Sequence, residues 1–108
     1  MRNSGERRAR RHYRLRGYRV LAENAWAGGN ELDLVLRRGG RLVFCEVKQR
    51  GREDFGAPFE HVGTEKQRRV RRAAEAWLAT HPELDGLEVS FDVVSVGPDG
   101  LRRTRDAF

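Results

Sequence analysis

The sequence has 108 residues, the size of one domain, and its 35% charged and 38% hydrophobic residues suit a soluble globular protein. No apolar run reaches the roughly 20 residues of a membrane-spanning helix, and the basic N-terminus lacks the apolar stretch of a signal peptide, so a cytoplasmic protein that binds no membrane is expected. The lone cysteine, Cys45, excludes an internal disulfide and a multi-cysteine zinc site.

The formal net charge of +6 arises from 22 basic residues, all arginine except Lys48 and Lys66. The first predicted element is a strongly basic helix over Ser4–Arg16, which Gly17 ends. Residues 1–19 hold eight arginines and one acid, Glu6. Such clustering indicates binding to a polyanion, and a solvated, solubilising helix face is the alternative. The residues of this helix predicted to contact nucleic acid are Arg7, Arg8, Arg11 and Arg14.

Three strands are expected next. The first covers Tyr18–Glu23, and a loop over residues 24–29 carries Trp26. The other two, Asn30–Arg37 and Arg41–Lys48, flank a glycine pair that favours a two-residue hairpin turn, because both central positions tolerate positive φ.

This Gly39-Gly40 turn sets a register in which the numbers of paired residues add up to 79. One side of the hairpin is then apolar, with the pairs Leu36–Val43, Leu34–Cys45 and Leu32–Val47. The other side carries the pairs Val35–Phe44, Asp33–Glu46 and Glu31–Lys48. A slip of one residue would scramble both sides, so the pattern supports the register.

The Asp33–Glu46 pair is unusual, because directly opposed like charges destabilise a sheet. Three arrangements would relieve this repulsion. One carboxyl group stays protonated, the strands separate so that water screens both groups, or a divalent cation lies between them. Oxygen ligands in small number suit Mg²⁺. Lys48 projects to the same side as Glu46, and lysine, unlike arginine, can activate a water. The alternative is a surface Glu31–Lys48 ion pair beside two solvated carboxylates.

The second half begins with a loop over Gly51–Gly63. A helix from Thr64 to about Thr80 follows, with Thr64 and Gln67 as a capping box. Strands are expected over Leu87–Val96 and near Leu101–Thr104, the second at an edge. Asp92 in the first of these is either a partner of the acidic site or an edge residue. The residues of the second helix predicted to contact nucleic acid are Lys66, Arg68, Arg69 and Arg72.

The spacing Asp33-x(12)-Glu46-x-Lys48 on a hairpin resembles the core of PD-(D/E)xK nucleases. The flanking runs Glu31–Val35 and Leu42–Lys48 with Arg50, and Phe91–Val94 further on, are similar to the YraN-type family of uncharacterised bacterial proteins, often described as Holliday-junction-resolvase-like. This resemblance covers essentially the whole chain. The chain departs from the family pattern at Asn30, where glycine is usual, and at Cys45, where valine is usual. It departs from the superfamily motif at Leu32, where the motif's name has proline.

The resemblance implies one α/β domain over residues 1–108, with a restriction-endonuclease-like αβββαβ core and a mixed sheet flanked by helices. It implies that Asp33 and Glu46 bind Mg²⁺ or Mn²⁺, that Lys48 assists the attacking water, and that Glu6 joins the acidic residues. Glu31 is a further candidate, and Arg50 is expected to contact nucleic acid.

Three functions remain open. The leading hypothesis is a metal-dependent endonuclease acting on DNA, including branched or junction DNA, as a homodimer by family analogy. The second is a nucleic-acid-binding protein without cleavage activity. The third is an adaptor whose basic helices bind an acidic protein.

Overall fold

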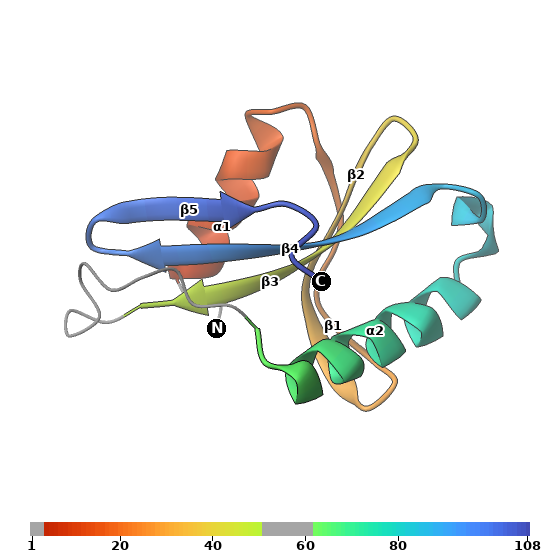
Figure 1. Ribbon diagram of the computed structural model, residues 1–108. Coiled ribbons are helices and arrows are strands. Elements are labelled where there is room, and N and C mark those ends of the chain that lie inside the picture. The colour runs from red at the N-terminus through yellow and green to blue at the C-terminus, as the bar shows by residue number, and fades with distance from the viewer. Residues whose placement is uncertain (1–3, 51–61) are drawn as a thin grey trace.

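The computed structural model describes residues 4–50 and 62–108. Its elements are helix α1 (Ser4–Arg14), strands β1 (Arg19–Ala27), β2 (Asn30–Arg38) and β3 (Arg41–Gln49), helix α2 (Thr64–Ala79), the 3-10 helix η2 (Pro82–Leu84), and strands β4 (Glu88–Gly97) and β5 (Gly100–Thr104). This order confirms the predicted α/β class (Figure 1). Within the described residues, no helix is both long and apolar enough to cross a lipid bilayer.

The strands form a mixed sheet in the order β1-β2-β3-β4-β5. Neighbouring strands run antiparallel except β3 and β4, which run parallel and are joined through α2. A parallel pair requires a crossover connection, and the amphipathic α2 supplies it by packing on one face of the sheet.

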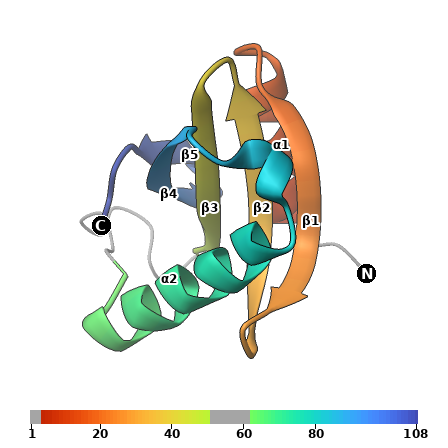
Figure 2. The same ribbon diagram turned by 90° about the vertical axis from the view of Figure 1, so that its right-hand side faces the viewer.

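The two helices cover opposite faces of this sheet (Figure 2). Tyr13 of α1 belongs to a buried cluster with Leu34 and Val43. Trp77 of α2 belongs to a second cluster, where its ring meets Phe44 edge to face. The basic surfaces of the two helices therefore do not form one continuous face.

Two predicted local features are wrong. Strand β1 extends to Ala27, so Trp26 lies in a strand and not in a loop. Gly63, not Thr64, is the N-cap of α2, and no side-chain cap bond is formed there. The Gln67 side chain donates instead to the Val62 carbonyl. The loop predicted over residues 51–63 falls mostly outside the described residues.

The predicted hairpin register holds from Arg38–Arg41 to Leu34–Cys45, and the predicted pairs Asp33–Glu46, Leu32–Val47 and Glu31–Lys48 lie beyond the last paired residues of the two strands. Beyond it, the regular alternation of β2 breaks at Asp33. Leu32 packs in the cluster under α2, whereas Leu34 packs in the cluster under α1, although residues two apart in a regular strand share a face. The prediction that Leu32 lies on the side of Leu34 is therefore wrong.

Strand β1 is irregular at the matching place. Asn24 has a φ of 50°, a left-handed conformation that asparagine adopts more readily than most residues. The irregularities at Asn24 and Asp33 occur in the neighbouring strands β1 and β2, close to where β2 leaves β3. They define the position of the candidate site.

Candidate metal centre

The candidate site lies where β2 and β3 separate. The last residues paired between these strands are Leu34 and Cys45, and the strands diverge beyond them (Figure 1). There the backbone N–H of Val47 donates to a carboxylate oxygen of Asp33 at 2.8 Å. The Asp33 side chain thus takes a hydrogen bond from β3 at the point where the ladder stops.

Three carboxylates meet at this opening. Glu6, Glu31 and Asp33 each offer one oxygen, and these oxygens all lie within 4.8 Å of one another. We call these three residues the acidic cluster. The sequence predicted an Asp33–Glu46 pair, with Glu31 and Glu6 as further members; the structure brings Glu31 and Glu6 to Asp33.

Glu6 reaches the cluster because α1 crosses the sheet with its first turn at the opening. Its side chain is buried, and the Asn24 amide donates to both carboxylate oxygens at 3.2 Å. The N-terminal turn of a helix also favours a negative charge. Asn24 thus combines two features of the site, the irregular backbone of β1 and the fixed position of Glu6, and sequence reasoning missed it.

The surroundings of Asp33 strongly disfavour the negative charge of its ionised carboxylate. Burial raises the pKa of Asp33 to about 7, and the neighbouring carboxylates of Glu46, Glu6 and Glu31 add to the increase. The N–H of Val47 acts in the opposite direction. Near neutral pH, a cation beside Asp33 would favour its ionised form.

Glu46 lies next to the acidic cluster but is engaged elsewhere. Its carboxylate forms an ion pair with Lys66 of α2, with 3.6 Å between Lys66 Nζ and Glu46 Oε2. Burial raises the pKa of Glu46, and Lys66 and then Lys48 lower it. Both lysines of the chain therefore act on this one carboxylate, a convergence that the sequence showed only for Lys48.

The donor set is chemically that of a hard divalent cation. The ligand atoms within reach are carboxylate oxygens, and the described part of the site contributes no histidine or thiol. Such oxygen sets suit Mg²⁺ and Mn²⁺ and are poor for zinc or copper. The acidic cluster therefore offers the oxygen ligands that a divalent metal site would need.

The predicted DNA-contacting residues are divided between two places. Arg7, Arg8, Arg11 and Arg14 are exposed on α1, where an Arg8 guanidinium nitrogen also donates to the Gly97 carbonyl at 3.2 Å. Arg68, Arg69 and Arg72 are exposed on α2, on the other face of the sheet, and Lys66 is half-buried near Glu46.

Arg50 is a buried structural residue. Its guanidinium bonds to the Asp99 carboxylate at 2.8 Å and to the Ser95 hydroxyl at 2.7 Å. Its side chain is only 6% exposed, so these contacts join the end of β3 to the β4–β5 hairpin. We therefore leave Arg50 out of the proposed DNA surface.

Asp92 is also structural. Its carboxylate accepts hydrogen bonds from the Tyr13 hydroxyl at 2.8 Å and from Arg103 Nε at 3.0 Å. This network ties α1 to β4 and β5 within the core under α1. Neither of the roles considered from the sequence, a partner of the acidic site or an edge residue, describes it.

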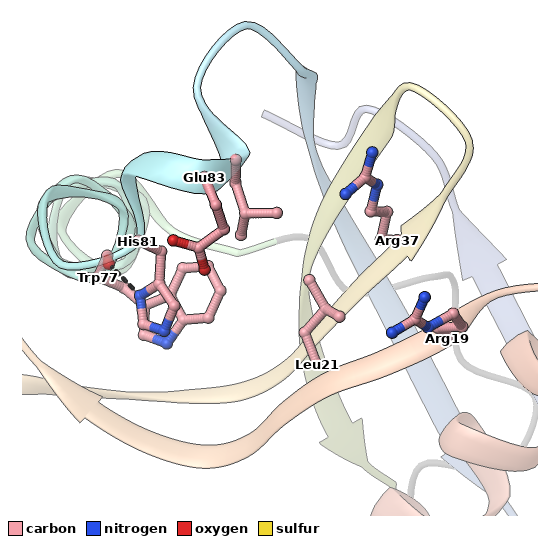
Figure 3. A pocket seen from close by; sticks show the side chains of 7 residues that line it. Arg19, Leu21, Arg37, Trp77, His81 and Glu83 are labelled. Atoms are coloured by element: carbon pink, nitrogen blue, oxygen red, sulfur yellow. Dashed lines mark hydrogen bonds between the residues drawn. The ribbon is translucent and has the colours of Figure 1, made fainter.

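A separate pocket of about 280 Å³ lies near the other end of β2 (Figure 3). The Trp77 and His81 rings stack along one wall, and Arg19 and Arg37 face them from β1 and β2. The pocket contains none of the predicted site residues. Its lining consists of Arg19, Leu21, Arg37, Trp77, His81, Glu83 and Leu84.

Fold and site together define a small α/β domain with a carboxylate cluster at the opening between two central strands. Residues 5–96 match the profile of the Uncharacterised protein family UPF0102, so the chain belongs to this family. This confirms the resemblance to YraN-type proteins. The chain is 45% identical to a UPF0102 protein of Frankia alni over 109 aligned positions, covering 96% of this chain and 90% of the relative. It is 43% identical to one of Xanthomonas campestris (95% and 86% covered) and 47% identical to one of Gloeobacter violaceus (82% and 71% covered).

Proposed function

We propose that this protein is an endonuclease that hydrolyses phosphodiester bonds of DNA with Mg²⁺ or Mn²⁺. The observation that carries the proposal is the acidic cluster of Glu6, Glu31 and Asp33, which forms where β2 leaves β3 and has Glu46 beside it. A site that must bring a metal ion to a phosphate needs crowded carboxylates, and a stable fold without a metal would avoid them.

In this proposal Asp33 and Glu46 are metal ligands, as the sequence predicted, and Glu6 and Glu31 complete or orient the oxygen set. Glu46 now contacts Lys66, so binding in this mode requires the Glu46 carboxylate to exchange a lysine for the metal. A bound divalent ion would polarise the scissile phosphate and lower the pKa of the attacking water.

The lysines supply the positive charge around the reacting phosphate. Lys48 lies two residues after Glu46 on β3, and its charge already acts on that carboxylate. From this position its ammonium group would orient the attacking water and stabilise the negative charge that develops in the transition state. Lys66, when it is released from Glu46, would bind a phosphate oxygen.

DNA would approach along α1. Four arginines of this helix, Arg7, Arg8, Arg11 and Arg14, are exposed, and the helix begins at the acidic cluster, so phosphates along it would lead to the metal position. Such contacts provide affinity and orientation without reading the base sequence. A DNA substrate also suits a cytoplasmic protein. Action on junction DNA as a homodimer is proposed by analogy alone.

The second candidate is a nucleic-acid-binding protein that does not cleave. The Lys66–Glu46 ion pair favours it, because this pair keeps one proposed metal ligand occupied. An adaptor for an acidic protein would use the same arginines. Salt dependence separates the last candidate, since DNA binding weakens with a log–log slope of about −0.9 per phosphate contacted.

Calorimetric titration of Mg²⁺ and Mn²⁺ into the wild type, Glu46→Gln and Glu83→Gln tests the metal site. Glu83 is an exposed acid at the distant pocket and serves as the matched control. We expect metal binding that Glu46→Gln weakens at least tenfold and Glu83→Gln leaves unchanged. Cleavage of branched, flapped and linear DNA is then measured with the same variants. Absence of metal binding by the wild type, even with DNA present, would refute the proposed activity.

A further inference from the structure

Trp26 is an exposed aromatic residue beside the acidic cluster. Its side chain is 74% exposed in β1, whereas Trp77, the other tryptophan, is only 7% exposed. Tryptophan combines a large apolar ring with a polar N–H, and such side chains are enriched at binding interfaces.

The position of Trp26 in the sheet indicates which kind of partner its ring would contact. Trp26 is the cross-strand partner of Glu31, a member of the acidic cluster. Directly opposed residues point to the same side of a sheet, and their Cβ atoms lie about 4.5–5.5 Å apart. Trp26 therefore lies next to Glu31 on the same side of the sheet, so its ring is placed to touch a nucleotide beside one held at the acidic cluster.

The residues next to Trp26 show to which face of the sheet its side chain points. Ala25 and Ala27, on either side of Trp26, pack against the cluster under α2, so Trp26 points to the face that carries α1. The exposed arginines of α1 lie on that same face. A polyanion guided by these arginines to the acidic cluster would pass the indole, whereas an apolar protein partner would have to tolerate the surrounding charges.

We infer that Trp26 stacks on an unpaired nucleobase next to the scissile phosphate, so that the substrate is DNA with unpaired bases at the cleavage point. This inference rests on the proposed function and names its substrate class. In a continuous duplex both faces of each base are covered by neighbouring pairs. A flap, gap or junction exposes a base face on which an indole can stack.

Binding is measured without cleavage, in EDTA and then with Ca²⁺, by tryptophan fluorescence and fluorescence anisotropy. The probes are a continuous duplex and the same duplex with a three-nucleotide gap. We expect the gapped DNA to quench the wild type more strongly than the duplex, and the difference to disappear in Trp26→Phe, where the Trp77 signal remains. Trp26→Ala should weaken binding of the gapped DNA roughly 5- to 100-fold and binding of the duplex less than twofold. Trp26→Phe, which keeps a stacking ring, should recover most of this affinity.

Leu15→Ala is the matched control, since Leu15 is 73% exposed but lies beyond the other end of α1. It should bind both probes as the wild type does. Equal affinity of the wild type for gapped and continuous DNA would overturn the inference. So would a Trp26→Ala change that alters self-association in sedimentation experiments and leaves DNA discrimination intact, because the ring would then join two copies of the chain.

The proposed function is tested separately with Mg²⁺ and Mn²⁺ in cleavage assays. Metal-dependent cleavage without a preference for unpaired bases would remove the inference and leave the nuclease. Trp26-dependent preference without cleavage would support the stacking role and refute the nuclease.

Discussion

The substitution Asp33→Asn in the metal-free protein tests whether the carboxylates of the acidic cluster repel one another, as carboxylates of a metal site would in the absence of its ion. The variant removes one charge and keeps an amide oxygen that can accept the Val47 N–H. Burial and the nearby carboxylates raise the pKa of Asp33 from its ordinary value of 3.8 to about 7. Ionised Asp33 therefore destabilises the folded state, and we expect Asp33→Asn to make the protein more stable at alkaline pH.

The magnitude follows from linkage. Between pH 4 and 7 the folded protein holds a proton on Asp33 that the unfolded chain has released, so stability falls as the pH rises through this range. About three pKa units at 1.36 kcal/mol each set a ceiling near 4 kcal/mol. Glu46 shares the repulsion and water reaches part of the site, so about 1–2 kcal/mol is expected at pH 8 and close to zero at pH 4.

Urea unfolding in EDTA at pH 4.5, 6 and 8 measures this difference, with Asp85→Asn at an exposed position as the control. Addition of Mg²⁺ at pH 8 should then stabilise the wild type and have less effect on Asp33→Asn, because a ligand stabilises only the state that binds it. A variant that is less stable than the wild type at pH 8, or a stability difference that does not change with pH, would refute the reasoning.

Three further predictions concern neighbouring parts of the molecule. Lys66→Gln removes the cation that competes for Glu46, so calorimetry at pH 8.5 should show about fivefold tighter Mg²⁺ binding, whereas weaker binding would mean that Lys66 supports the site. Gly28→Ala places a Cβ 3.0 Å from the Arg72 carbonyl oxygen, whereas the Cβ of Gly29→Ala meets nothing within 4 Å, although both glycines have positive φ. Thermal unfolding should therefore show Gly28→Ala to be less stable than Gly29→Ala by about 1–3 kcal/mol. Equal losses of stability in the two variants would contradict the contact between this turn and α2. Arg14→Gln should reduce the salt slope of DNA binding by about 0.9 and leave the stability of the fold unchanged. By contrast, Arg50→Gln, at a buried position, should lower the stability by about 3–5 kcal/mol. A salt slope that Arg14→Gln does not alter would remove α1 from the DNA surface.

The fold was largely predictable because its signals are local. The Gly39-Gly40 turn determined the hairpin register, and the periodic apolar residues of α2 identified the helix that crosses from β3 to β4. The extent of β1 was missed because Gly28-Gly29 was interpreted as part of a long loop. The same two-glycine signal that identified the second hairpin also marks the first, and it would have placed Trp26 in a strand.

The candidate site was only partly predictable, because its assembly depends on features far apart in the chain. The turn predicts Asp33 opposite Glu46, but it does not predict that the pairing of β2 with β3 ends at Leu34–Cys45 or that the alternation of β2 breaks at Asp33. This break arises with the left-handed backbone of Asn24, a conformation that asparagine permits but does not require. The approach of Glu6 depends on how α1 crosses the sheet, and the Lys66–Glu46 contact depends on where α2 begins. Periodicity within each element carries no information on either point.

Two carboxylates of this chain show what distinguishes a structural acid from a ligand. Asp92 is 1% exposed, and its charge is met by Arg103, by the Tyr13 hydroxyl and by the backbone N–H of Asp106. Asp33 is also largely withdrawn from water, yet the charges that shift its pKa come from other carboxylates, with the Val47 N–H acting against them.

The fold therefore compensates a buried carboxylate where a carboxylate serves stability, and it gathers further negative charge around Asp33. In the proposed function a divalent ion from solution compensates the carboxylates gathered around Asp33, and the crowding that destabilises the metal-free site is what would give such an ion its affinity.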